Sequence, residues 1–109
     1  MGMMSMEFIR PLYWGESIEN RNKVMKQLKQ KKWFPVVYLI AINQGVDQLD
    51  IYSVRQLRHR FYEENPPMIV GIAGDYEEAT DIVVRIAREA LKKQGNCNLK
   101  EYLLNRNLE

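Results

Sequence analysis

The order of apolar and polar residues predicts strands and helices in alternation along the chain. Residues 6–14 are rich in strand-forming side chains, and Pro11 favours an edge position because it lacks a backbone donor. Residues 18–32 place apolar side chains at helical spacing along one side. Residues 33–42 and 68–73 are continuous apolar runs, which are typical of strands covered on both faces.

The segment between the two apolar runs fits two structures. Residues 49–54 alternate as in a short strand, whereas the apolar positions over residues 54–61 fit a helix that continues to about Glu64. We prefer the helix and keep the strand as the alternative. The sequence Asn65-Pro66-Pro67 ends this helix, because the residue before a proline disfavours helical geometry.

The segment from Asp75 to Gly95 has the clearest helix signals in the chain. Asp75 and Glu78 have the spacing of a capping box, and Gly95 stands where a helix commonly ends. Acidic residues gather in the first turns and basic residues in the last turns, as the helix dipole favours. A second pair with capping-box spacing opens a short closing helix within residues 98–104.

These elements predict a single α/β domain over residues 6–104. The alternating order indicates about three mainly parallel strands in a β-α-β-α-β-α arrangement with right-handed crossovers, followed by a short C-terminal helix. A chain of 109 residues is long enough to bury a core without disulfides or metals. We expect residues 1–5 to be a disordered or vector-derived start, and residues 105–109 to be a frayed tail.

Composition excludes several classes of protein. The longest apolar run is far shorter than the roughly 20 residues that a membrane helix needs, so we expect no membrane partner. The single cysteine, Cys97, leaves no disulfide framework and no cysteine-built metal site, which indicates a reducing compartment. We therefore expect a cytoplasmic protein that uses no cofactor and no metal.

The long helix near the C-terminus is apolar over a wider arc than packing on one sheet face requires. Val84 and Leu91 widen this arc. Two explanations remain open: the closing helix covers them through Leu103 and Leu104, or a second copy of the chain does. A three-stranded sheet also leaves two edges to protect, which favours pairing. We expect a homo-oligomer, namely a dimer, or a protein partner, with these four residues as interface candidates.

The predicted helix over residues 18–32 carries a basic run. Residues 21–32 contain six Lys and Arg side chains and no acidic one, which raises nucleic-acid binding as a function. The lysines surround the helix instead of forming one stripe, and the whole chain has a formal net charge of only +2. Nucleic-acid binding therefore stays a weak third alternative.

A cleft at the carboxyl ends of the strands is the alternative site, because open α/β sheets bind ligands there. Arg58 has a planar fork that suits carboxylate or phosphate, although its stem also fits along apolar surface with its head on Tyr62. The Gly71–Gly74 sequence lacks the spacing of a phosphate loop, and the acids after it repel anions. The ligand-binding candidates are Arg58, Asp50, Tyr52, Tyr62, Glu16, Gly74 and Asp75.

No set of residues in the sequence has the pattern of a catalytic site. His59 is the only histidine and falls on the polar side of its predicted helix. Cys97 has no basic neighbour to activate its thiol, and no His, Cys and carboxylate group has metal-ligand spacing. The pattern favours a non-enzymatic module that self-associates or docks on a protein partner.

Two phrases of the sequence resemble a known group of proteins. Leu49-Asp50-Ile51-Tyr52 and the run from Ile69 to Ala79 are similar to phrases in a family of small uncharacterised bacterial proteins, mostly from Gram-positive anaerobes. The resemblance covers about residues 10–104. It implies a bacterial cytoplasmic setting, and no activity, cofactor or functional residue is carried over from it. It also draws attention to Tyr76 and to Asp50, Tyr52 and Gly74, which lie in these phrases.

Overall fold

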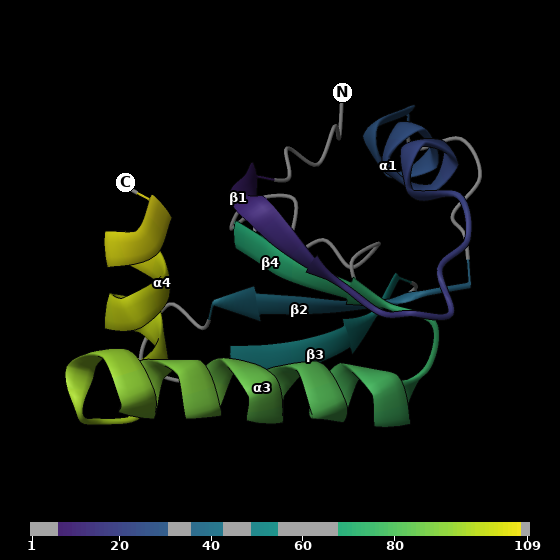
Figure 1. Cartoon of the computed structure of the whole chain (residues 1–109). Coiled ribbons are helices and arrows are strands. Elements are labelled where there is room, and N and C mark those ends of the chain that lie inside the picture. The colour runs from purple at the N-terminus through teal and green to yellow at the C-terminus, as the bar shows by residue number, and fades with distance from the viewer. Residues whose placement is uncertain (1–6, 31–35, 43–48, 55–67, 108–109) are drawn as a thin grey trace.

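The computed structural model describes residues 7–30, 36–42, 49–54 and 68–107. In these ranges the chain forms four strands and three helices (Figure 1). In chain order they are β1 (Glu7–Trp14), α1 (Arg21–Gln30), β2 (Tyr38–Ile42), β3 (Leu49–Ser53), β4 (Met68–Ala73), α3 (Tyr76–Gln94) and α4 (Leu99–Asn107).

The four strands form one mixed sheet in the order β1-β4-β2-β3. β1 runs parallel to β4, whereas β2 runs antiparallel to both of its neighbours, β4 and β3. The expectation of about three mainly parallel strands in a β-α-β-α-β-α arrangement is therefore wrong. The described sheet has a single parallel pair, between its first and its last strand.

The difference from the predicted strand directions arises in the segment that follows β2. Residues 49–53 form strand β3, the alternative that we kept open for this segment, and Tyr52 stands opposite Leu39 of β2. A parallel neighbour needs a crossover of about a dozen residues or more, whereas residues 43–48 alone separate the two strands. Short spacing therefore requires antiparallel pairing. Residues 55–64 of the expected helix lie outside the described residues.

β1 lies at one edge of the sheet, as Pro11 predicts. The Arg10–Pro11 peptide bond is cis, and the pairing of β1 with β4 is interrupted between Phe8 and Tyr13. The apolar runs form the two inner strands, β2 and β4, whose residues are almost all buried. Strand positions were therefore predicted better than strand directions.

Helices cover both faces of the sheet (Figure 1). α3 and α4 pack on one face, where Ile82 and Ile86 of α3 join the side chains of the sheet. α1 packs on the other face, where Leu28 meets Leu39 of β2 and Ile69 of β4. The alternation of side chains along each strand supplies both of these cores.

The ends of α3 confirm the signals in the sequence. Asp75 is the N-cap, and its Oδ1 accepts a hydrogen bond of 2.7 Å from the Glu78 N–H. Gly95 has a φ of 77° and donates its N–H to the Leu91 carbonyl at 3.0 Å, a left-handed ending that glycine adopts easily. Within the described ranges, no helix has both the length and the apolar character that crossing a membrane requires.

Candidate functional site

The carboxyl ends of β1 and β4 meet where an α/β sheet commonly binds a ligand. Here the Glu78 carboxylate occupies this position. Its Oε1 accepts hydrogen bonds of 2.7 Å from the Gly74 N–H and from the Ser17 hydroxyl, and its Oε2 accepts one of 3.1 Å from the Ser17 N–H. These bonds join the loop after β1 to the loop after β4.

Glu78 also departs from the capping box that its spacing predicts. In such a box, the glutamate would accept from the N–H of the N-cap residue, Asp75. Instead it accepts from Gly74, one residue earlier, and from Ser17. The hydrogen bond from the Gly74 backbone lowers the pKa of the Glu78 carboxyl most strongly; burial opposes it, and the two hydrogen bonds from Ser17 lower the pKa further. The carboxylate is therefore held in its charged form.

Two glycines make room for this carboxylate. A Cβ added at Gly15 would collide with the Glu78 carboxylate, and one at Gly74 would collide with the Ser17 hydroxyl. Gly74 and Asp75, both ligand-binding candidates, thus take part in joining the two loops and in capping α3. The Glu78 carboxylate takes up donors that a ligand would use, and a hollow of about 290 Å³ lined by Glu16, Glu78 and Arg85 remains beside it.

The other ligand-binding candidates do not gather at one place. Asp50 and Tyr52 lie on β3, where the Tyr52 hydroxyl donates to Asp50 Oδ2 at 3.1 Å. Glu16 is exposed and follows β1, at the opposite edge of the sheet, three interstrand spacings or about 14 Å away. Arg58 and Tyr62, like His59, lie outside the described residues.

A partly buried polar cluster that the sequence did not reveal links β1, α3 and α4. The hydroxyls of Tyr13 and Tyr102 both donate to Oε1 of Glu89, the bond from Tyr102 being 3.0 Å long. The guanidinium of Arg106 lies 4.6 Å from the centre of the Tyr13 ring, and its Nη2 donates to the Pro11 carbonyl at 2.7 Å. Because these partners are far apart in the chain, no local spacing could have indicated them.

The tyrosines of this cluster are held in their neutral form. Burial, and then the hydrogen bond to Glu89, raises the pKa of Tyr13. The same two causes raise the pKa of Tyr102. Neutral hydroxyls that donate to one carboxylate fasten α4 to β1 and α3, so we assign this cluster to stability. Within the described residues, no group of three or more His, Cys, Asp and Glu side chains is arranged to bind a metal.

The interface candidates separate into buried and exposed residues. Leu103 is fully buried in the core beneath α3 and α4, and Leu104 packs against the same core, so α4 uses these side chains within the domain. Val84 and Leu91 remain 47% and 54% exposed on the outer side of α3. The closing helix therefore does not explain the wide apolar arc at these two positions.

Val84 and Leu91 belong to a stripe of exposed residues along α3, which we call the α3 stripe. Its members follow one another at helical spacing on the side away from the sheet: Glu77, Asp81, Val84, Arg88, Leu91 and Lys92. Acids stand at the N-terminal end of the stripe, bases at the C-terminal end, and an apolar side chain lies between them. When a second copy of α3 runs in the opposite direction, its basic end lies against the acidic end of the first copy. The α3 stripe is therefore complementary in charge to a second, antiparallel α3 stripe.

The chain matches no protein-family model, no curated protein and no solved structure. The resemblance to small bacterial proteins through Leu49–Tyr52 and Ile69–Ala79 therefore stays a prediction. Function has to be inferred from the fold and the surfaces of the chain itself.

Proposed function

We propose that the chain is a non-enzymatic cytoplasmic module that pairs with a second copy of itself through the α3 stripe. The observation that carries the proposal is the segregation of charge along this exposed face. In a homodimer with twofold symmetry, both copies use the same surface patch. A contact between one residue of the first copy and another residue of the second copy therefore occurs a second time with the copies exchanged. A patch with acids at one end and bases at the other fulfils this condition.

The pairing has a defined register. With two copies of α3 antiparallel and Val84 of each near the twofold axis, Asp81 of one copy faces Arg88 of the second copy. Glu77 then faces Lys92, one turn further out. At 1.5 Å per residue, the members of each charge pair differ in height along the axis by only about 1.5 Å. Both pairs occur twice, which gives four opposite-charge contacts.

The apolar members of the stripe supply the remaining attraction. Val84 meets its own copy at the axis, and Leu91 lies along the stem of Glu77 on the other helix. Both side chains are about half exposed in the single chain, so pairing removes apolar surface from water. A helix of 19 residues is about 28 Å long, which gives an interface at the small end of the stable range. We expect dissociation in the micromolar range.

Two further observations support the rest of the proposal. At the strand ends, where an α/β enzyme commonly holds its substrate, the Glu78 carboxylate takes up the hydrogen-bond donors of Gly74 and Ser17. Cys97 is exposed and unpaired, which suits the reducing conditions of the cytoplasm.

Sedimentation equilibrium over micromolar to millimolar protein tests the proposal. We expect the wild type to form a dimer as concentration rises, and Val84→Glu to stay monomeric because two carboxylates meet at the axis. Val36→Glu is the matched control, since Val36 is 91% exposed and lies outside α3. A wild type that remains monomeric throughout, or a dimer that survives Val84→Glu, would contradict the proposal.

A further inference from the structure

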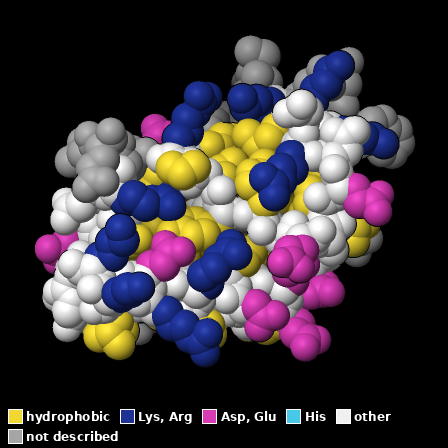
Figure 2. Space-filling model, in the orientation of Figure 1, with side chains coloured by type: hydrophobic (Ala, Val, Ile, Leu, Met, Phe, Trp, Pro, Cys, Tyr) yellow, Lys and Arg dark blue, Asp and Glu magenta, His cyan; other side chains and the backbone are white. Residues whose placement is uncertain are grey.

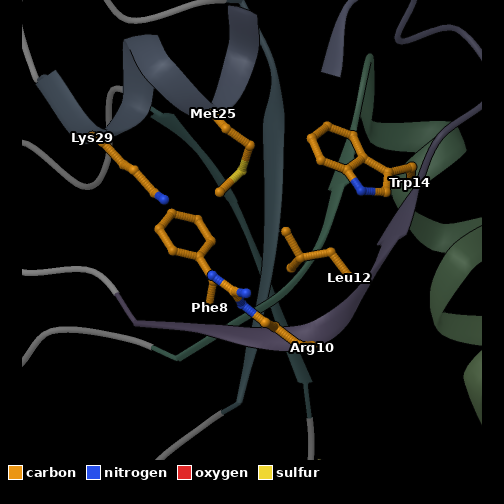
Figure 3. A pocket seen from close by; sticks show the side chains of 6 residues that line it. All are labelled: Phe8, Arg10, Leu12, Trp14, Met25 and Lys29. Atoms are coloured by element: carbon orange, nitrogen blue, oxygen red, sulfur yellow. The ribbon is translucent and has the colours of Figure 1, made fainter. Parts of the chain in front are cut away.

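A hollow of about 500 Å³ lies between β1 and α1 (Figure 3). It is on the α1 side of the sheet, where its apolar side chains pack against the core that contains Leu28 and Leu39. Six side chains line it: Phe8, Arg10, Leu12 and Trp14 from β1, and Met25 and Lys29 from α1. The hollow therefore belongs to an edge strand and to the basic helix of the chain.

Local geometry brings these side chains together. Alternation along β1 sends every second residue from Phe8 to Trp14 toward α1, while Ile9 and Tyr13 join the core under α3. Met25 and Lys29 are four residues apart and so lie one above the other on α1. No pattern in the sequence indicates this hollow, because the strand and the helix each have the residue spacing of ordinary packing elements.

The two ends of the hollow differ in chemistry. Figure 3 shows the charged heads of Arg10 and Lys29 both pointing toward Phe8. Trp14 stands at the other end, with Leu12 and Met25 between. One end is therefore cationic and the other is apolar and aromatic.

The surroundings strengthen the positive charge of this region. α1 carries four basic residues and no acidic one, and its Arg21 lies 5.4 Å from the centre of the Trp14 ring. Figure 2 shows an apolar patch in the same region, with Lys and Arg side chains around it. An apolar surface ringed by cations is complementary to an occupant that is apolar and negatively charged.

We propose that the hollow binds a small organic anion with a flat apolar body, such as an aromatic carboxylate, sulfonate or phosphate monoester. Its volume lies in the range of small-molecule sites, which pair apolar walls with a few charged groups. Phe8 and Trp14 offer ring faces for a flat body, and the flexible Met25 adapts to its outline. Arg10 and Lys29 neutralise the anionic group with charge-assisted hydrogen bonds.

The placement of charge disfavours a nucleic-acid strand as occupant. A strand presents a phosphate at every nucleotide and needs cations along its whole path. Here the two cations that line the hollow converge at the Phe8 end. Beyond Trp14, a smaller hollow is lined by three carboxylates, those of Glu16, Glu78 and Asp81, and by one cation, Arg85, so it repels phosphates overall. A single anionic group fits this arrangement.

The site is independent of the proposed dimer. The hollow and the α3 stripe lie on opposite sides of the sheet (Figure 1), so pairing through α3 leaves it open in both copies. The site stands whether or not the chain dimerises.

Fluorescence titration with two probes tests the inference. 1-Anilinonaphthalene-8-sulfonate is a flat apolar anion, and N-phenyl-1-naphthylamine is the same skeleton without the sulfonate. We expect the anionic probe to bind more tightly, and Lys29→Glu to weaken it about tenfold by reversing a charge at the site. Lys23→Glu makes the same change in net charge on α1 without lining the hollow, and we expect less than about a twofold effect.

Three results would overturn the inference. Equal affinity for both probes would show that the hollow binds through apolar contacts alone. An equal loss of affinity for the anionic probe in Lys29→Glu and Lys23→Glu would show that only the overall charge of α1 matters. Binding of a single-stranded oligothymidylate that displaces the anionic probe would assign the region to nucleic acid. Thermal unfolding of each variant verifies that the titrated proteins are folded.

Discussion

The carboxylate of Glu78 accepts hydrogen bonds from both the hydroxyl and the backbone N–H of Ser17, at 2.7 and 3.1 Å. Ser17 belongs to the loop after β1, and Glu78 to the first turn of α3. Together with the bond from Gly74, this contact joins the two loops at the end of the sheet where the two parallel strands terminate. Glu78 is thus a structural residue at a position that many α/β proteins reserve for ligands.

We predict that Glu78→Gln lowers the free energy of unfolding by about 1–2 kcal/mol, because a neutral amide accepts these hydrogen bonds less strongly than a carboxylate. Denaturant unfolding measures the change. Glu77→Gln, measured like Glu78→Gln at protein concentrations below those of dimerisation, is the control, since Glu77 lies in the same turn and is exposed. Equal losses in the two variants would attribute the effect to the helix dipole instead of to the bonds with Ser17 and Gly74.

The pKa of Glu78 gives this contact a pH dependence of known sign. Because the folded-state pKa lies below the ordinary value of 4.5, the contribution is complete above about pH 4.5 and is lost as pH falls through the folded-state pKa. We expect the unfolding free energies of wild type and Glu78→Gln to differ at neutral pH and to converge in acid. A difference that is constant with pH would contradict the assigned pKa direction.

If α3 pairs with its second copy as proposed, a double charge reversal should restore the dimerisation that each single reversal weakens. Asp81→Arg alone and Arg88→Glu alone place like charges opposite each other, so each should weaken dimerisation at least about tenfold. The double variant reverses both members of the pair and should restore dimerisation. Sedimentation equilibrium measures all three proteins.

Thermal unfolding separates this rescue from an effect on the helix alone. Asp81→Arg replaces an attraction to Arg85, four residues further along α3, by a repulsion, so the monomer of the double variant gains no stability at that position. Its recovery as a dimer would therefore require contacts between copies. Failure of the double variant to dimerise would contradict the register with Asp81 opposite Arg88. Lys93→Glu, on the opposite side of α3, should leave dimerisation unchanged.

The polar cluster under α4 predicts a late tyrosine titration. Raised folded-state pKa values mean that Tyr13 and Tyr102 stabilise the fold fully below about pH 10, and that this contribution is lost as pH rises through their folded-state values. Absorbance at alkaline pH should show a component that ionises last or only on unfolding, and Tyr13→Phe should diminish it. An unchanged titration in Tyr13→Phe would show that the late component belongs to other tyrosines.

The sequence predicts those elements that depend on local signals. Asp75 and Gly95 cap α3, and Pro11 places β1 at an edge of the sheet. Each of these features follows from the backbone preference of one residue and needs only neighbouring residues to form. The apolar arc of the same helix points to Val84 and Leu91, but whether the closing helix covers them could not be predicted, and the structure leaves both about half exposed.

Strand direction and the long-range contacts could not be predicted in this way. The residues of β3 alternate weakly and are all half-buried, so neither strand nor helix spacing dominates. The bonds of Glu78 with Ser17, and of Tyr13 with Glu89, join residues far apart in the chain, and only the folded sheet brings them together. The hollow beside Phe8 likewise arises from two elements that look ordinary when taken separately.

The parallel pairing of β1 with β4 also constrains the order of folding. Glu7 pairs with Met68, so the first strand has no partner until the chain has been synthesised nearly through β4. The pair β2–β3 is local and should form early, because its loop closure costs less entropy. We expect β1 to dock late, which means that the hollow beside α1 exists only in the completed domain and can serve as a reporter of finished folding.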